Sequence, residues 1–128
     1  MRNPQRSSWH REMSDDEVKL HLGKAIFQGE IDRAYFDCLR GGQTFDEAVR
    51  ESIRYGALSL LVNRAVELRG VTTEDFASEV WSRLRPSVTG FHRIDDPDQR
   101  RRAVVSTVAR LLLNVGFAYW KSIKGEFS

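Results

Sequence analysis

The sequence predicts an all-α protein, a compact bundle of about five helices. Three observations lead to this fold class. Apolar residues recur every three or four positions over most of the chain, residues typical of helix starts precede these stretches, and glycine or proline follows them. We find no convincing run of alternating apolar and polar residues, so we expect no β-sheet.

The first helix is expected to begin at Ser14, because Ser14 and Glu17 have the spacing of a capping box and the acids of "SDDE" suit a helix N-terminus. Its apolar positions are Val18, Leu22, Ala25 and Ile26. Gly29 weakens the pattern, which then resumes and ends at the glycine pair 41–42.

A second capping box, "TFDE", starts a long helix at Thr44 that we expect to reach Gly70. Gly56 lies within its apolar stripe, where a neighbouring helix can approach closely. The next stretch, "TTEDFASEVWSRLRP", begins with Thr72 or Thr73 as cap and is expected to stop at Pro86. Its apolar face consists of Phe76, Val80, Trp81 and Leu84.

Residues 87–95 are predicted to form a loop, with Phe91 as a candidate buried anchor. The last helix then begins with Asp96 as cap and Pro97 in its first turn, and Gly125 closes it. Its stripe is the most apolar of the chain: Val104, Val105, Val108, Leu111, Leu112, Val115 and Tyr119.

The 128 residues, 41% of them hydrophobic and 30% charged, are typical of one soluble globular domain. We expect a flexible arm over residues 1–13 and a single helical domain over 14–128. No apolar run approaches the length of a bilayer span, and the polar opening does not resemble a signal peptide. The expected location is therefore the cytoplasm, with no membrane partner.

Residues for catalysis or metal binding do not cluster in the sequence. The three histidines are far apart, no glycine-rich phosphate loop is present, and the carboxylate pairs fall at helix starts, where capping accounts for them. The single cysteine, Cys38, excludes an internal disulfide. We therefore predict that the protein is not an enzyme and uses no metal or cofactor.

Basic residues gather in the last third of a chain whose net charge is only +2. They can face phosphate or form a solvated helix face. Tyr119 and Trp120 are adjacent, so we expect Tyr119 to pack inward and Trp120 to point outward beside Lys121 and Lys124. Trp120 then stacks on an unpaired base, forms half of a protein interface or lies on a neighbouring helix.

The order of elements resembles region 2 of the extracytoplasmic-function type of bacterial sigma factors, over residues 45–124. Glu74 and Asp75 match the acidic pair that opens a helix in that family, and Glu79, Val80, Trp81 and Leu84 match the pattern that closes it. Ala109, Arg110, Leu111 and Lys121 match the following helix. Ser78 replaces the family's glutamine, the intervening loop is longer, and no region 4 follows.

The resemblance implies a transcription factor module that binds bacterial RNA polymerase core and promoter DNA. A second DNA-reading protein is then needed in place of region 4. The implied polymerase-docking residues are Glu74, Asp75, Glu79 and Arg83. The implied nucleic-acid-binding residues are Arg100, Arg101, Arg102, Arg110, Trp120, Lys121 and Lys124. The alternative is a small helical adaptor or inhibitor of phage or plasmid type that acts by protein contact alone and exposes an apolar patch.

Overall fold

A computed structural model describes residues 13–63 and 68–126, except for the side chains of Lys124 and Glu126. Nearly all of this part of the chain is helical, and it contains no strand, which confirms the predicted all-α class. Five helices have eleven residues or more: α2 (Asp15–Ala25), α3 (Gln28–Arg40), α4 (Phe45–Asn63), α5 (Thr73–Leu84) and α7 (Pro97–Glu126). The predicted arm, residues 1–13, lies outside the described residues except for Met13.

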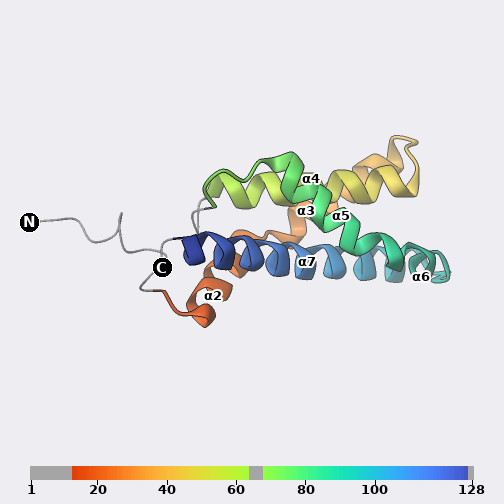
Figure 1. The fold of residues 1–128 in the computed structure, drawn as a ribbon. Helices are drawn as coiled ribbons and strands as arrows, with labels where there is room; N and C mark the ends of the chain where they lie inside the picture. Colours follow the sequence, from red (N-terminus) through yellow and green to blue (C-terminus); the bar gives the residue numbers. More distant parts are fainter. Residues whose placement is uncertain (1–12, 64–67, 127–128) are drawn as a thin grey trace, which may run out of the picture.

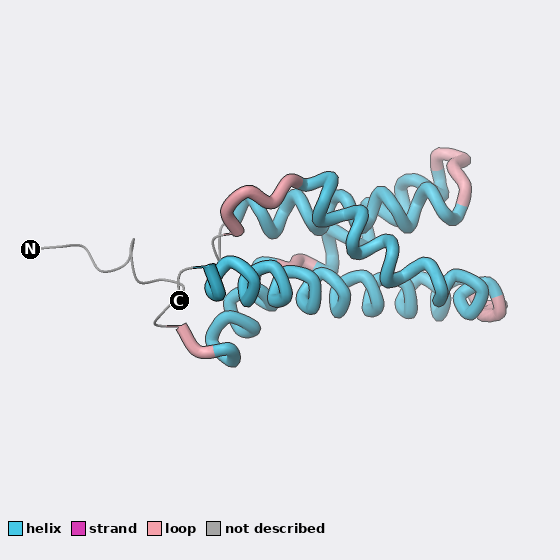
Figure 2. The backbone as a smooth tube through the Cα atoms, viewed as in Figure 1, coloured by secondary structure: helices cyan, strands magenta, loops and turns pink. Residues whose placement is uncertain are grey.

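The long helix α7 runs the length of the bundle (Figure 1), and α2, α3, α4 and α5 all contact it. Helices α3 and α4 pack against each other, while α5 lies between α4 and α7 and contacts both. The tube view in Figure 2 shows that loops occupy little of the described chain. Helix α5 is thus held on two flanks and is open to solvent on its outer side.

Both predicted capping boxes form. The Ser14 hydroxyl accepts a hydrogen bond from the Glu17 amide at 3.1 Å, and the Glu17 carboxylate accepts one from the Ser14 amide at 3.1 Å. These bonds lower the pKa of Glu17. Thr44 and Glu47 make the same exchange at the start of α4. Short-range sequence signals therefore place these two helix starts correctly.

The long helix that starts at the second capping box was predicted to reach Gly70, and it does not. Helix α4 is described as far as Asn63, residues 69–70 belong to a turn, and Gly70 has a φ of 78°. That left-handed angle favours glycine, so "RG" ends a turn here rather than a helix. Residues 64–67 are outside the described part of the chain.

The region around Pro86 also departs from the prediction. Arg85 adopts helical angles, φ −48° and ψ −39°, although the following proline disfavours them. The chain therefore continues through a 3₁₀ turn, η1 (Arg85–Ser87), into the short helix α6 (Val88–His92), where a loop was expected. Phe91 is 6% exposed, as predicted for a buried anchor. Burying this ring favours the helical path over an open loop.

Helix α7 is the central helix of the bundle. The Asp96 carboxylate caps it by accepting a bond from the Asp98 amide at 3.1 Å, and Val104, Val108, Leu112 and Val115 are fully buried. Contrary to the sequence expectation, its segment Pro97–Ile123 is long and apolar enough to cross a bilayer, by length and composition. The core helix of a soluble protein passes the same test, and 44% of the most apolar window is buried inside the bundle.

Candidate functional site

The outer side of α5 is the candidate docking site. Phe76, Val80 and Leu84 are fully buried, so they fix the rotation of this helix about its axis. Because a helix turns once every 3.6 residues, the residues between them are directed outward. The exposed residues of α5 are Glu74, Asp75, Ser78, Glu79, Ser82 and Arg83.

Asp75 and Glu79 lie one turn apart on the flank of α5 that borders α7. The Tyr119 hydroxyl of α7 donates a hydrogen bond to the Asp75 carbonyl at 3.4 Å. Burial raises the pKa of Tyr119, and the Glu79 and Asp75 carboxylates raise it further. Arg83 acts on the pKa of Tyr119 in the opposite direction, so it partly offsets the charge of the two acids at this edge of the α5–α7 contact.

Arg83, the fourth predicted docking residue, lies on the same flank and pairs with Glu79 at 3.4 Å. Both side chains keep more than 40% of their surface exposed. An exposed pair of this kind contributes about 0.2–1 kcal/mol to stability, so the Glu79 carboxylate can exchange Arg83 for another cation at little cost.

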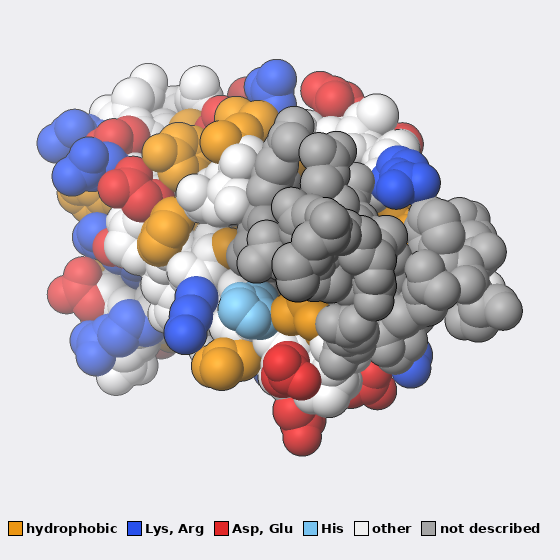
Figure 3. Space-filling view, turned by 90° about the vertical axis from the view of Figure 1, so that its left-hand side faces the viewer, with side chains coloured by type: hydrophobic (Ala, Val, Ile, Leu, Met, Phe, Trp, Pro, Cys, Tyr) orange, Lys and Arg blue, Asp and Glu red, His pale blue; other side chains and the backbone are white. Residues whose placement is uncertain are grey.

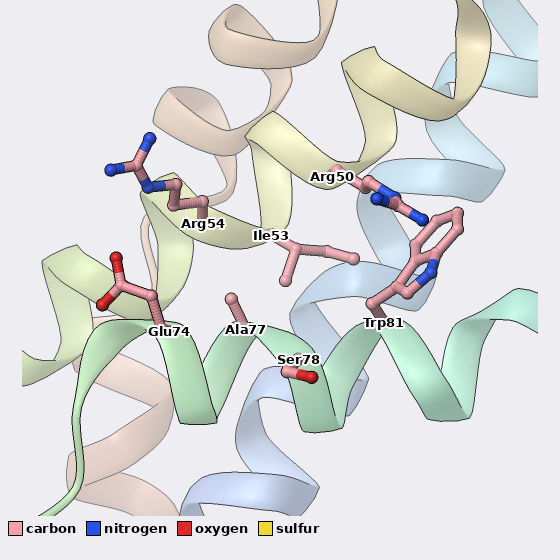
Figure 4. A pocket seen from close by; sticks show the side chains of 7 residues that line it. All are labelled: Arg50, Ile53, Arg54, Glu74, Ala77, Ser78 and Trp81. Atoms are coloured by element: carbon pink, nitrogen blue, oxygen red, sulfur yellow. The ribbon is translucent and has the colours of Figure 1, made fainter.

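Glu74 is separated from the acid pair and lies on the opposite flank of α5, which faces α4. Here α4 and α5 enclose a groove of about 270 Å³. Figure 4 shows Glu74 and Arg54 at one end of this groove and Arg50 and Trp81 at the other. The structure thus divides the four predicted docking residues between two flanks.

Trp81 was predicted as a core residue, but it is only half-buried and lines the groove. The guanidinium carbon of Arg50 lies 4.5 Å from the centre of its ring. Sequence reasoning did not identify Arg50 and Arg54 as site residues. Their spacing of four places them on one side of α4, but only the packing of α4 against α5 brings them to Trp81.

Two of the four arginines predicted to contact nucleic acid make contacts inside the protein. The Arg100 side chain donates to the carbonyls of Phe91 and Ile94, at 3.1 and 3.0 Å from Nε, and so caps the end of α6. Arg101 makes a two-point ion pair with Asp32 of α3, with an Nη2–Oδ2 distance of 2.7 Å. These arginines tie α7 to neighbouring elements, which removes them from an external phosphate surface.

The outward orientation predicted for Trp120 is wrong. Trp120 is fully buried, whereas Tyr119 is half-exposed. Helix α7 is covered on two sides here, because α2 packs beside it as well as α5. A Cβ added at Gly116, one turn before Trp120, would lie 3.4 Å from Leu22 of α2, and the Phe117 ring stacks on the Trp120 ring at 5.9 Å between centres. Adjacent residues can both be sheltered when a helix has neighbours on two sides.

Arg102, Arg110 and Lys121 are exposed and fall on one side of α7 by helical spacing. Lys121 lies 3.4 Å from Asp15 of α2, and both side chains remain about half exposed. Lys124 belongs to the same helix, but its side chain lies outside the described residues. We call Arg102, Arg110 and Lys121 the basic stripe.

Within residues 13–63 and 68–126, no three histidine, cysteine or acidic side chains are grouped to hold a metal ion. Burial raises the pKa of the Cys38 thiol, and the nearby acids raise it further, so the reactive thiolate is disfavoured. Comparisons with protein-family models, with curated proteins and with solved structures find no match to this chain.

Proposed function

We propose that the protein is a sigma-like transcription factor module that docks on bacterial RNA polymerase core through the outer acidic side of α5. The observation that carries this proposal is the exposed pair Asp75 and Glu79 on a helix whose rotation is fixed by three buried side chains. The resemblance of residues 45–124 to region 2 of sigma factors supplies the identity of the partner. In that family the corresponding helix docks on a helical coiled coil of the polymerase.

Charge complementarity supports a basic partner surface at this flank. Carboxylates held outward on a rigid helix lose little conformational freedom when they meet arginine or lysine. The partner's cation replaces Arg83 beside Glu79, and it meets the Asp75 carboxylate directly. Docking of this kind depends on charge and therefore weakens as salt screens it.

The basic stripe of α7 is the proposed contact with promoter DNA. Arg102, Arg110 and Lys121 project from one side of the longest helix and can follow a phosphate backbone. Three exposed cations give weak binding without base reading, so a second DNA-reading protein selects the promoter. The proposed location is the cytoplasm, where polymerase and promoter DNA occur.

Retention on immobilised bacterial core RNA polymerase tests the docking proposal. We expect the wild-type chain to be retained and the Asp75→Ala/Glu79→Ala variant to bind about ten-fold more weakly, because two charge pairs are lost at the interface. The control variant Asp16→Ala/Glu51→Ala removes the same charge from exposed sites on α2 and α4 and should bind normally. Failure of the wild-type chain to be retained would end the sigma-like proposal.

A second candidate function, an adaptor that acts by protein contact alone, is favoured by the outer side of α4. Tyr55, Leu58 and Val62 are 41%, 48% and 67% exposed at helical spacing. Figure 3, a view onto one end of the bundle, shows apolar side chains at the surface between basic and acidic ones. Such residues can form a protein interface that does not use the basic stripe.

DNA binding separates these two functions. The sigma-like proposal predicts binding to promoter-length duplex or single-stranded DNA that weakens steeply between low and moderate salt. The Arg102→Ala/Arg110→Ala variant should bind more weakly by about ten-fold, because two phosphate contacts are removed. Fluorescence anisotropy with labelled DNA measures this effect, and absence of binding at low salt would favour the adaptor.

A further inference from the structure

The groove between α4 and α5 has a chemistry opposite to that of the Asp75–Glu79 flank. Two of its lining side chains are cationic and one is anionic, and the others are apolar or small: Arg50, Arg54, Glu74, Ile53, Ala77, Ser78 and Trp81. We propose that this groove binds a carboxylate-bearing segment of a partner protein, with Arg50 as the principal carboxylate receptor. This second docking site goes beyond the proposed function and does not depend on the acidic flank.

Arg50 is suited to this role because Trp81 holds its guanidinium group in place. The flat group lies over the indole ring at 4.5 Å, a cation–π contact that restricts a side chain with many rotamers. The contact is with the π face of the ring, which accepts no conventional hydrogen bond, so the N–H donors of the group are left for a ligand. Those donors match the two oxygens of a carboxylate, so the entropy lost on binding is small.

The remaining groove residues define the rest of the ligand. Ile53 and Ala77 lie between the two charged ends, as Figure 4 shows. Ile53 is only 1% exposed, so the half-buried Ala77 provides most of the apolar floor for a side chain next to the bound carboxylate. At the far end, Arg54 offers a second cation and Glu74 a carboxylate. A short segment that combines acidic and apolar residues fits this arrangement.

A peptide fits the groove better than a nucleic acid does. A base needs an open aromatic face for stacking, and Arg50 already covers a face of the Trp81 ring. The Glu74 carboxylate on the rim also repels a phosphate backbone, whereas a peptide can place a neutral residue there.

Titration with a short blocked peptide of alternating glutamate and leucine tests the proposal. The readout is the NMR resonance of the Trp81 indole N–H, assigned by its loss in Trp81→Phe. We expect this resonance to shift on addition of the peptide. Arg50→Lys keeps the positive charge but cannot donate two parallel hydrogen bonds to one carboxylate. It should weaken peptide binding by about five- to ten-fold. Arg93→Ala removes an exposed arginine outside the groove and is the matched control.

Three results would overturn the inference. The first is no shift at about millimolar peptide, and the second is equal peptide affinity in wild type and in a folded Arg50→Ala variant. The third is a Trp81 shift with single-stranded oligothymidylate, or with a blocked peptide of alternating lysine and leucine, but not with the acidic peptide. Because Arg50→Lys leaves Asp75 and Glu79 in place, failure here is distinguishable from failure of polymerase docking.

Discussion

Replacing Trp120 with alanine is expected to lower the free energy of unfolding by about 3–5 kcal/mol, the range for truncating a large buried aromatic side chain. Trp120 is fully buried and stacks on Phe117, so its removal leaves a cavity that the packed helices close only in part. Urea unfolding followed by circular dichroism measures the change.

The control for this experiment is Arg110→Ala, on the exposed side of the same helix. It should change stability by less than about 0.5 kcal/mol, because it removes no buried contact. If Trp120→Ala were as stable as Arg110→Ala, the tryptophan would be exposed after all. Its assignment as a nucleic-acid contact would then return.

Replacing Gly56 with valine is the second change with a large expected effect. A Cβ at this position of α4 would overlap the Cδ1 of Leu112 and approach the Ile31 side chain to 3.3 Å. Leu112 and Ile31 are themselves buried, so the added atoms force α3 or α7 away from α4. We expect a loss of about 3 kcal/mol in unfolding free energy, or failure to fold.

Gly23 in α2 provides the matched comparison, because a Cβ there meets nothing within 4 Å. Gly23→Val should leave stability within about 0.5 kcal/mol of wild type. Thermal and urea unfolding of both variants measure the difference. Equal effects at the two positions would contradict the close approach of α7 to Gly56.

The parts of the fold that the sequence predicts well are those governed by neighbours along the chain. Ser14, Thr44 and Asp96 start helices because each side chain bonds to amides two or three residues later. The buried face of α5 also follows from local periodicity. The three-residue stripe of Phe76, Val80 and Leu84 was correctly predicted as core.

The features that the sequence does not predict depend on elements distant in the chain. Trp120 is fully buried on a helix that α2, near the other end of the chain, also covers, and no local pattern records that packing. The ion pair between Arg101 and Asp32 likewise depends on a distant element, because Asp32 belongs to α3. Pro86 was expected to end helical structure, but burial of Phe91 draws the chain into α6.

The candidate site also combines features set by neighbours along the chain with features set by distant elements. The exposed positions of Asp75 and Glu79 could be read from helical periodicity, and both are exposed in the structure. The groove could not be predicted from periodicity, because Arg50 and Trp81 come into contact only through the packing of α4 against α5. Glu74 and Asp75 lie on different flanks of α5, because consecutive helical residues differ in direction by about 100°.

Site-specific photo-crosslinking tests the central claim, that the outer side of α5 docks on core RNA polymerase. A photoreactive phenylalanine analogue is placed at Ser82, which is exposed beside the acid pair, or at Leu58, which is exposed on α4. The docking proposal predicts a covalent adduct with a polymerase subunit from position 82 and none from position 58. An adduct from position 58 alone would contradict it and would place the partner on the apolar side of α4.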